Sequence, residues 1–219
     1  MPDDPELENL RVTPMPRNVP GERRERSHDG RTLKASICDL IDNSIDGGAY
    51  NIRIQYQPTN WRGEDSGVLL IEDDGRGIAP RNMMKSLQFN SEREDEYHWW
   101  ELGSFGVGLD HACLAHGSEI TLLSKQEGGE FRVARLSGES TDRIGDNWAQ
   151  HDHDTMMENL PSAWDTVPYQ YALERIQAID QGTIVLLENM DPPNVDVEQG
   201  LEPFEEIENF IGMIFHEYL

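Results

Sequence analysis

The sequence predicts an α/β fold, and two kinds of segment carry that prediction. Five segments have the alternating or continuous apolar patterns of β-strands, namely NIRIQYQP, GVLLIED, EITLLSK, FRVARLS and GTIVLLEN. Before them, a segment around DLIDNSID has the apolar spacing of a helix. We expect this helix to begin near Arg31 and to end at Gly47-Gly48, because paired glycines commonly stop a helix.

The helix motif DLIDNSID places Asp39 and Asn43 four residues apart, and therefore on one face of the helix. Asn43 offers an amide oxygen, which suits a Mg²⁺ ion that already holds phosphate oxygens and waters. Asp39, one turn earlier, is placed to orient a water for attack on a terminal phosphate. An ordinary amphipathic helix with a polar outer face has the same pattern, so the motif alone is a hypothesis.

The motif DDGRG follows the apolar strand GVLLI and has the features of an adenine site. The carboxylate of Asp73 is an acceptor for the exocyclic amine of adenine. Gly75 and Gly77 keep the space beside the base free of side chains. Taken alone, Asp-Gly marks common turns, so this motif also needs its context.

The motif GSFGVG is glycine-rich and leads into an apolar, helix-like run. Its glycines allow backbone amides to point at phosphates, and the following helix adds the positive end of its dipole. These glycines are Gly103, Gly106 and Gly108. The three motifs in this order, with a strand before the acid and a helix after the glycines, predict an ATP site.

In order and spacing the motifs resemble the GHKL superfamily, the gyrase, heat-shock chaperone, histidine kinase and MutL group. The resemblance spans about residues 30 to 190, and its wording is most similar to microrchidia-like and related prokaryotic ATPases. A weaker match is Gly182-Thr183, where the family commonly places a threonine near the adenine-binding acid. The resemblance implies the Bergerat nucleotide fold, an α/β two-layer sandwich of a mixed β-sheet with helices on one face.

The resemblance also implies slow, Mg²⁺-dependent ATP hydrolysis with Asp39 as the catalytic base and Asn43 as the protein's ligand to Mg²⁺. Many hydrolysing members carry a glutamate as base, and aspartate is one methylene shorter. Either the helix then sits slightly closer to the phosphates or hydrolysis is slow. The alternative function is a nucleotide-sensing module that binds ATP without turnover, followed by a histidine-kinase-type catalytic domain. The candidate nucleotide-binding residues are Asn43, Asp46, Asp73, Gly75, Gly77, Ile78, Gly103, Ser104, Phe105, Gly106, Val107, Gly108 and Thr183.

The chain is expected to have an N-terminal arm, residues 1–30, and an ATP-binding domain, residues 31–219. The arm is either flexible or crosses to a second subunit. Residues 79–102 are expected to form a lid, and in the superfamily nucleotide closes the lid and joins two subunits. The relatives usually continue into a transducer domain that supplies a lysine. Because the chain stops at Leu219, we expect an excised domain, a small stand-alone member, or a subunit whose partner carries that domain.

Acidic residues outnumber basic residues by 42 to 18, which gives a formal net charge of -24. Direct nucleic-acid binding by this surface is disfavoured, because phosphate contacts need positive charge. The acid excess suits either a high-salt cytoplasm, where screening weakens self-repulsion, or an ordinary acidic protein. No apolar run reaches membrane-spanning length and no signal peptide is evident, so we expect a cytoplasmic location and no membrane partner.

Three smaller features complete the expectations. Cys38 and Cys113 fall in apolar helices and are predicted to be core residues rather than a disulfide. The cluster HDHD, residues 151–154, is predicted to be a solvated loop, because adjacent ligands lack the spacing of a metal site. Lys125 lies on a predicted strand and is not assigned a role at the phosphates.

Overall fold

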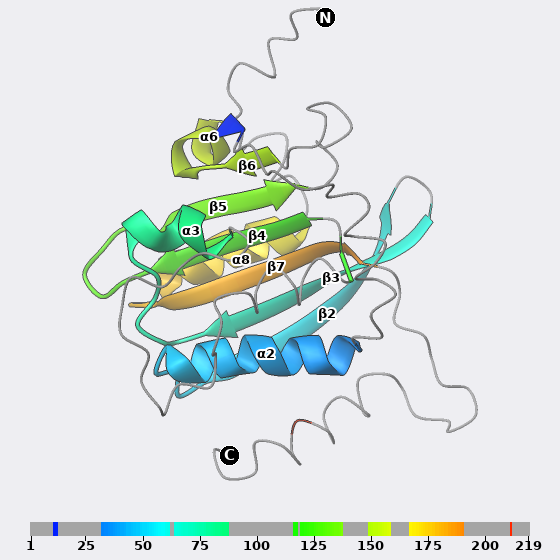
Figure 1. The fold of residues 1–219 in the computed structure, drawn as a ribbon, viewed down its shortest axis with the longest axis horizontal. Helices are drawn as coiled ribbons and strands as arrows, with labels where there is room; N and C mark the ends of the chain where they lie inside the picture. Colours follow the sequence, from blue (N-terminus) through cyan, green and yellow to red (C-terminus); the bar gives the residue numbers. More distant parts are fainter. Residues whose placement is uncertain are drawn as a thin grey trace, which may run out of the picture.

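The computed structural model describes residues 11–12, 32–61, 64–87, 116–117, 119–137, 149–158, 167–190 and 211. Within these residues one sheet of seven strands has the order β1-β6-β5-β4-β7-β3-β2 (Figure 1). The strands are β1 (Arg11–Val12), β2 (Ile52–Trp61), β3 (Glu64–Asp73), β4 (Glu119–Lys125), β5 (Arg132–Ser137), β6 (Ala149–His151) and β7 (Gly182–Met190).

The helices lie between these strands in the sequence. They are α2 (Leu33–Asp46), the 3₁₀ turn η1 (Pro80–Asn82), α3 (Met83–Ser86), α6 (His153–Glu158) and α8 (Val167–Ala178). Over the described ranges, no helix combines the length and apolarity needed to cross a membrane.

The sheet has an apolar core on each face, because side chains alternate along every central strand. On one face Leu69 and Ile71 of β3 pack in a cluster with Ile37 and Leu40 of α2. On the other face Leu70 packs in a cluster with residues of α8 and α6, among them Tyr169, Ala172, Ile176 and Met156. Figure 1 shows α8 behind β4 and β7, on the opposite side of the sheet from α2.

The α/β class is confirmed, but two details of the expected sandwich are wrong for the described residues. The sheet is not mixed: all six pairings are antiparallel, since β2–β3 and β4–β5 pair as sequence neighbours and β7 runs opposite to both β3 and β4. Helices also cover both faces rather than one. The physical reason is that the central strands carry apolar side chains on both faces, which need covering on both sides.

The expected elements otherwise appear close to their predicted positions. Helix α2 ends directly before Gly47, and the five predicted strands correspond to β2, β3, β4, β5 and β7. The expected lid begins with η1 and α3, where Met83 and Leu87 are buried in the core. Residues 88–102 of the lid lie outside the described residues. Cys38 is a buried, free cysteine as predicted, whereas Cys113 lies outside the described residues.

Candidate functional site

Helix α2 presents the first group of candidate residues. Thr32 caps its N-terminus, because the Thr32 hydroxyl accepts a hydrogen bond from the amide of Ala35 at 3.3 Å. At the other end the amide of Gly47 donates to the carbonyl of Asn43 at 2.9 Å. Along the helix Asp39 is half-buried and Asn43 is exposed. Their spacing sets them on one face, as the sequence predicted.

The candidate adenine acid, Asp73, is the last residue of β3 and faces α2. The hydroxyl of Ser44 donates to Asp73 Oδ2 at 3.1 Å, and the amide of Gly75 donates to Oδ1 at 2.9 Å. Burial raises the pKa of Asp73 to about 6, although these two hydrogen bonds and a third from the backbone of Thr183 act to lower it. Each carboxylate oxygen has two lone pairs, so acceptor capacity remains for a further donor. The residue fits the amine of a purine base.

The turn after Asp73 needs its glycines for reasons of packing. A Cβ added to Gly75 would lie 2.9 Å from the carbonyl oxygen of Gly47, at the end of α2. Gly77 has a φ of +69°, and its Cβ would lie 2.1 Å from the carbonyl oxygen of Lys125. Both requirements arise from the protein's own backbone. A role of these glycines beside a bound base stays a prediction.

The structure brings Thr183 and Ile78 to the same place as Asp73. Thr183 is the partner of Asp73 in the β3–β7 ladder. Buried Ser124 lies between the two segments: its hydroxyl accepts from the amide of Ile78 at 2.8 Å and donates to the carbonyl of Gly182 at 3.0 Å. The hydroxyl oxygens of Ser124 and Thr183 are also 3.0 Å apart.

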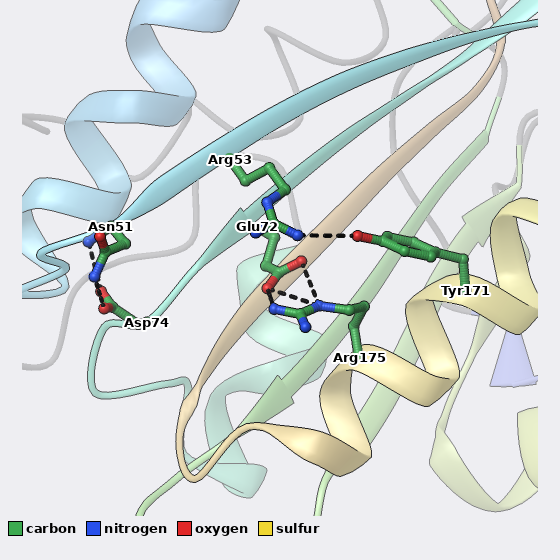
Figure 2. Close-up of polar contacts among 6 residues, drawn as sticks. All are labelled: Asn51, Arg53, Glu72, Asp74, Tyr171 and Arg175. Carbon is green, nitrogen blue, oxygen red and sulfur yellow. Dashed lines mark hydrogen bonds and ion pairs between the residues drawn. The ribbon is translucent and has the colours of Figure 1, made fainter.

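Sequence reasoning missed Ser44, Ser124 and the second acid of DDGRG, Asp74. Figure 2 shows Asp74 beside Asn51, the residue directly before β2. Asp74 Oδ1 accepts from the amides of Tyr50 and Asn51 at 2.7 and 2.8 Å, and Oδ2 accepts from the Asn51 side chain at 2.7 Å. Desolvation opposes these hydrogen bonds, but together they lower the pKa of Asp74. Asp74 therefore has a structural function, the fixing of the turn to β2.

Two other candidates have contacts of their own. Asp46 is half-buried at the end of α2. Burial raises the pKa of Asp42, and the nearby charge of Asp46 raises it further. Lys125 Nζ donates to the carbonyl of Ile179 at 2.7 Å, beyond the last residue of α8.

The remaining site predictions concern the glycine-rich segment and the HDHD cluster. The glycine-rich segment, residues 103–108, lies outside the described residues. The HDHD cluster is not a loop throughout, because β6 ends at His151 and α6 begins at His153. His153 Nδ1 accepts from the amide of Val133 at 3.2 Å. Within the part of the chain that the structure describes, no group of His, Cys, Asp or Glu side chains is arranged to hold a metal ion.

Comparison with known proteins identifies a family whose sequence model matches this chain. The sequence model of the family described as histidine kinase-, DNA gyrase B-, and HSP90-like ATPase matches residues 31–161, more than half of the 219 residues. This range contains the helix motif, the DDGRG turn and the glycine-rich segment. The described strand β7, with Thr183, follows it.

Several individual proteins are also similar to this chain in sequence. The chain is 26% identical over 105 residues to ATPase morc-1 of Caenorhabditis elegans, covering 48% of this chain and 12% of the relative. It is 34% identical over 118 residues to the DNA mismatch repair protein MutL of Clostridium acetobutylicum, covering 50% of this chain and 18% of the relative. ATPase MORC2B of Mus musculus is 26% identical over 95 residues, covering 43% and 9%. The matches therefore span less than a fifth of each relative.

Proposed function

The chain belongs to the histidine kinase-, DNA gyrase B- and HSP90-like ATPase family, and we propose that it binds Mg-ATP and hydrolyses it slowly. The observation that carries the proposal is the environment of Asp73. Burial raises the pKa of the Asp73 carboxylate to about 6. Asp73 is the last residue of β3, and it lies beside Thr183 of β7 and before the turn that contains Gly75 and Gly77. Ser44, Gly75 and the backbone of Thr183 donate to it, and the four lone pairs of a carboxylate leave room for one more donor, which we assign to the exocyclic amine of adenine.

The other groups of the nucleotide are assigned to α2 and the glycine-rich segment. Asn43 is exposed and supplies one amide oxygen to Mg²⁺, whose remaining ligands are phosphate oxygens and waters. The ion, when bound with ATP, neutralises charge on the phosphates. Asp39, one turn away on α2, orients the attacking water. Residues 103–108 hold the phosphates through backbone amides, and Asp46, Gly75, Gly77, Ile78 and Thr183 complete the site.

The proposed use of this reaction is a gate or clamp. ATP closes the lid, residues 79–102, and two chains associate while nucleotide is bound; hydrolysis reopens them. The first part of the lid supports such coupling, since Met83 and Leu87 are buried against the cluster that contains α2. The second subunit is either another copy of this chain or a partner that carries a transducer domain.

A second candidate function is nucleotide sensing without turnover. The observation that favours it is the identity of the base, because Asp39 is one methylene shorter than the glutamate of many hydrolysing members of the superfamily. In this case ATP binding alone would drive the change in association. We favour hydrolysis, because the carboxylate is retained and a water can bridge a small gap.

The test combines calorimetric titration of ATP, with and without Mg²⁺, with a phosphate-release assay on the same protein. Binding together with release of phosphate is the expected result. Binding without release would select the sensing function. Absence of ATP binding in the presence of Mg²⁺ would refute the assignment of the site.

A further inference from the structure

The face of the sheet opposite α2 carries an ion pair directly behind the proposed adenine acid. Glu72 precedes Asp73 in β3, so its side chain leaves the sheet on the α8 side. It is only 6% exposed. Arg175 of α8 binds it as a fork: Arg175 Nε lies 3.1 Å from each carboxylate oxygen, and Arg175 Nη2 also donates to Oε1 (Figure 2).

This arrangement fixes the end of β3 in position. Two parallel hydrogen bonds from a planar guanidinium restrict the direction of a carboxylate as well as its position. Glu72 and Asp73 share a peptide unit, so a rotation of the strand that moves Glu72 also moves Asp73. The Glu72–Arg175 pair lies on one face of the sheet, and through the backbone it also restrains Asp73 on the other face, at the end of β3.

The connection from α8 to β7 holds the same turn by a further contact. The side chain of Gln181 donates to the carbonyl of Asp74 at 3.4 Å. Gly182 packs so closely that a Cβ there would lie 2.1 Å from the carbonyl oxygen of Asp73. Residues Gln181 and Gly182, which directly follow α8, are thus in contact with the DDGRG segment.

We propose that Arg175 is a positioning residue for Asp73: through Glu72 it sets the direction in which Asp73 presents its carboxylate to adenine. The inference rests on the proposed function, since it concerns the ATP affinity of that same site. Arg175 does not touch the nucleotide in this proposal. Its effect passes through the backbone of β3 and is limited to recognition of the base.

The test compares two ligands, ATP and inorganic tripolyphosphate, each titrated with Mg²⁺ by calorimetry. Arg175→Ala is expected to weaken ATP binding about tenfold, which is a typical size for the coupling between neighbouring residues. Tripolyphosphate binding should be unchanged. In an Asp73→Asn background the same substitution should cause no further loss of ATP affinity. If Arg175 had only a structural role, its substitution would weaken the binding of both ligands, and it would still weaken ATP binding in the Asp73→Asn background.

The matched control is Arg53→Ala. Arg53 is the cross-strand partner of Glu72 in the β2–β3 ladder and donates to the hydroxyl of Tyr171 at 3.2 Å, so this variant removes an arginine contact between the sheet and α8 while the Arg175–Glu72 fork stays in place (Figure 2). Its ATP affinity should equal that of the wild type. Should Arg175→Ala not fold, Arg175→Lys keeps the charge and loses the fork, and an ATP-specific loss smaller than about tenfold is expected.

The outcomes separate this inference from the proposed function. If Asp73→Asn binds ATP as tightly as the wild type, the proposed adenine site itself is wrong. If Asp73→Asn loses affinity but neither Arg175 variant does, only the positioning role is overturned. Equal weakening of ATP and tripolyphosphate by the Arg175 variants would overturn it as well.

Discussion

Ser44 and Asp73, which are 29 residues apart in the sequence, form a hydrogen bond of 3.1 Å between the hydroxyl of Ser44 and Asp73 Oδ2. The contact ties α2, which carries the proposed base and metal ligand, to β3, which carries the proposed adenine acid. Ser44 is buried, and its hydroxyl also lies 3.2 Å from the carbonyl of Leu40. The two halves of the site are therefore joined by one small buried side chain.

Asp73→Asn is expected to lower ATP affinity more than tenfold. An amide in place of the carboxylate removes a charge-assisted acceptor and can present a donor to the adenine amine, which costs about 1.5 to 3 kcal/mol. Calorimetric titration of ATP measures the loss. The control is Asp74→Asn, which makes the same chemical change at the neighbouring acid that fixes β2. Equal losses in both variants would contradict the adenine assignment.

The stability of the wild type relative to Asp73→Asn should fall as the pH rises. Burial raises the pKa of Asp73 from 3.8 to about 6, so between these values the folded state binds a proton that the unfolded state has released. The stabilising contribution is complete below the lower value and is lost as the pH passes the upper one. A difference of about two pKa units corresponds to about 3 kcal/mol.

Urea unfolding of both proteins at about pH 4.5 and about pH 7.5 measures this change. The other carboxylates titrate in both proteins, so their contributions cancel in the difference. A wild-type-minus-variant difference that is constant with pH would show that Asp73 has an ordinary pKa.

Binding and turnover should separate at α2. Asp39→Ala is expected to bind ATP normally and to lose phosphate release about 100-fold or more, because it removes the proposed base. Asn43→Ala should instead make nucleotide binding nearly independent of Mg²⁺. Asp42→Ala, on the same helix, is the control for loss of an acid. Phosphate release by Asp39→Ala at the wild-type rate would eliminate Asp39 as the base.

Much of the fold follows from local sequence patterns. The helical spacing of α2 is limited at its two ends by the capping residues Thr32 and Gly47. The alternating strands could be located without tertiary information. The second core was also visible in principle, because β7 has a continuous apolar run and Tyr169, Ala172 and Ile176 stand at helical spacing in α8. Continuous runs are typical of strands that are buried on both faces.

The missed site residues lack such a local signal. Ser44 and Ser124 are small hydroxyl side chains, and each acquires its role from a partner 29 or 46 residues away. Arg175 is 103 residues from Glu72, and nothing in the helical pattern of α8 identifies the acid that it binds. Predicting these contacts requires the order of strands in the sheet, which places β7 between β3 and β4.

Arg135→Met is expected to destabilise the fold by about 3 to 5 kcal/mol, the cost of leaving buried charge without its partner. Arg135 Nη2 pairs with Glu119 and lies 3.7 Å from Glu188 Oε1, and the side chains of both acids are 8% exposed. Burial raises the pKa of Glu188, and Arg135 opposes that shift. Urea unfolding measures the loss. Arg132→Met, on the same strand, should cost about 1 kcal/mol or less, and an equal cost would contradict the assignment.

Association of two chains should require both ATP and salt. Each chain has a formal net charge of -24, so two copies repel. Exposed charges are screened beyond about 10 Å at 0.1 M salt and about 3 Å at 1 M, so repulsion weakens as salt rises. ATP is expected to supply the contacts that only the closed state makes. Sedimentation with a non-hydrolysable ATP analogue, at low and at molar salt, should show dimers only with analogue and mainly at high salt. A monomer under every condition would contradict ATP-gated association of this chain with itself.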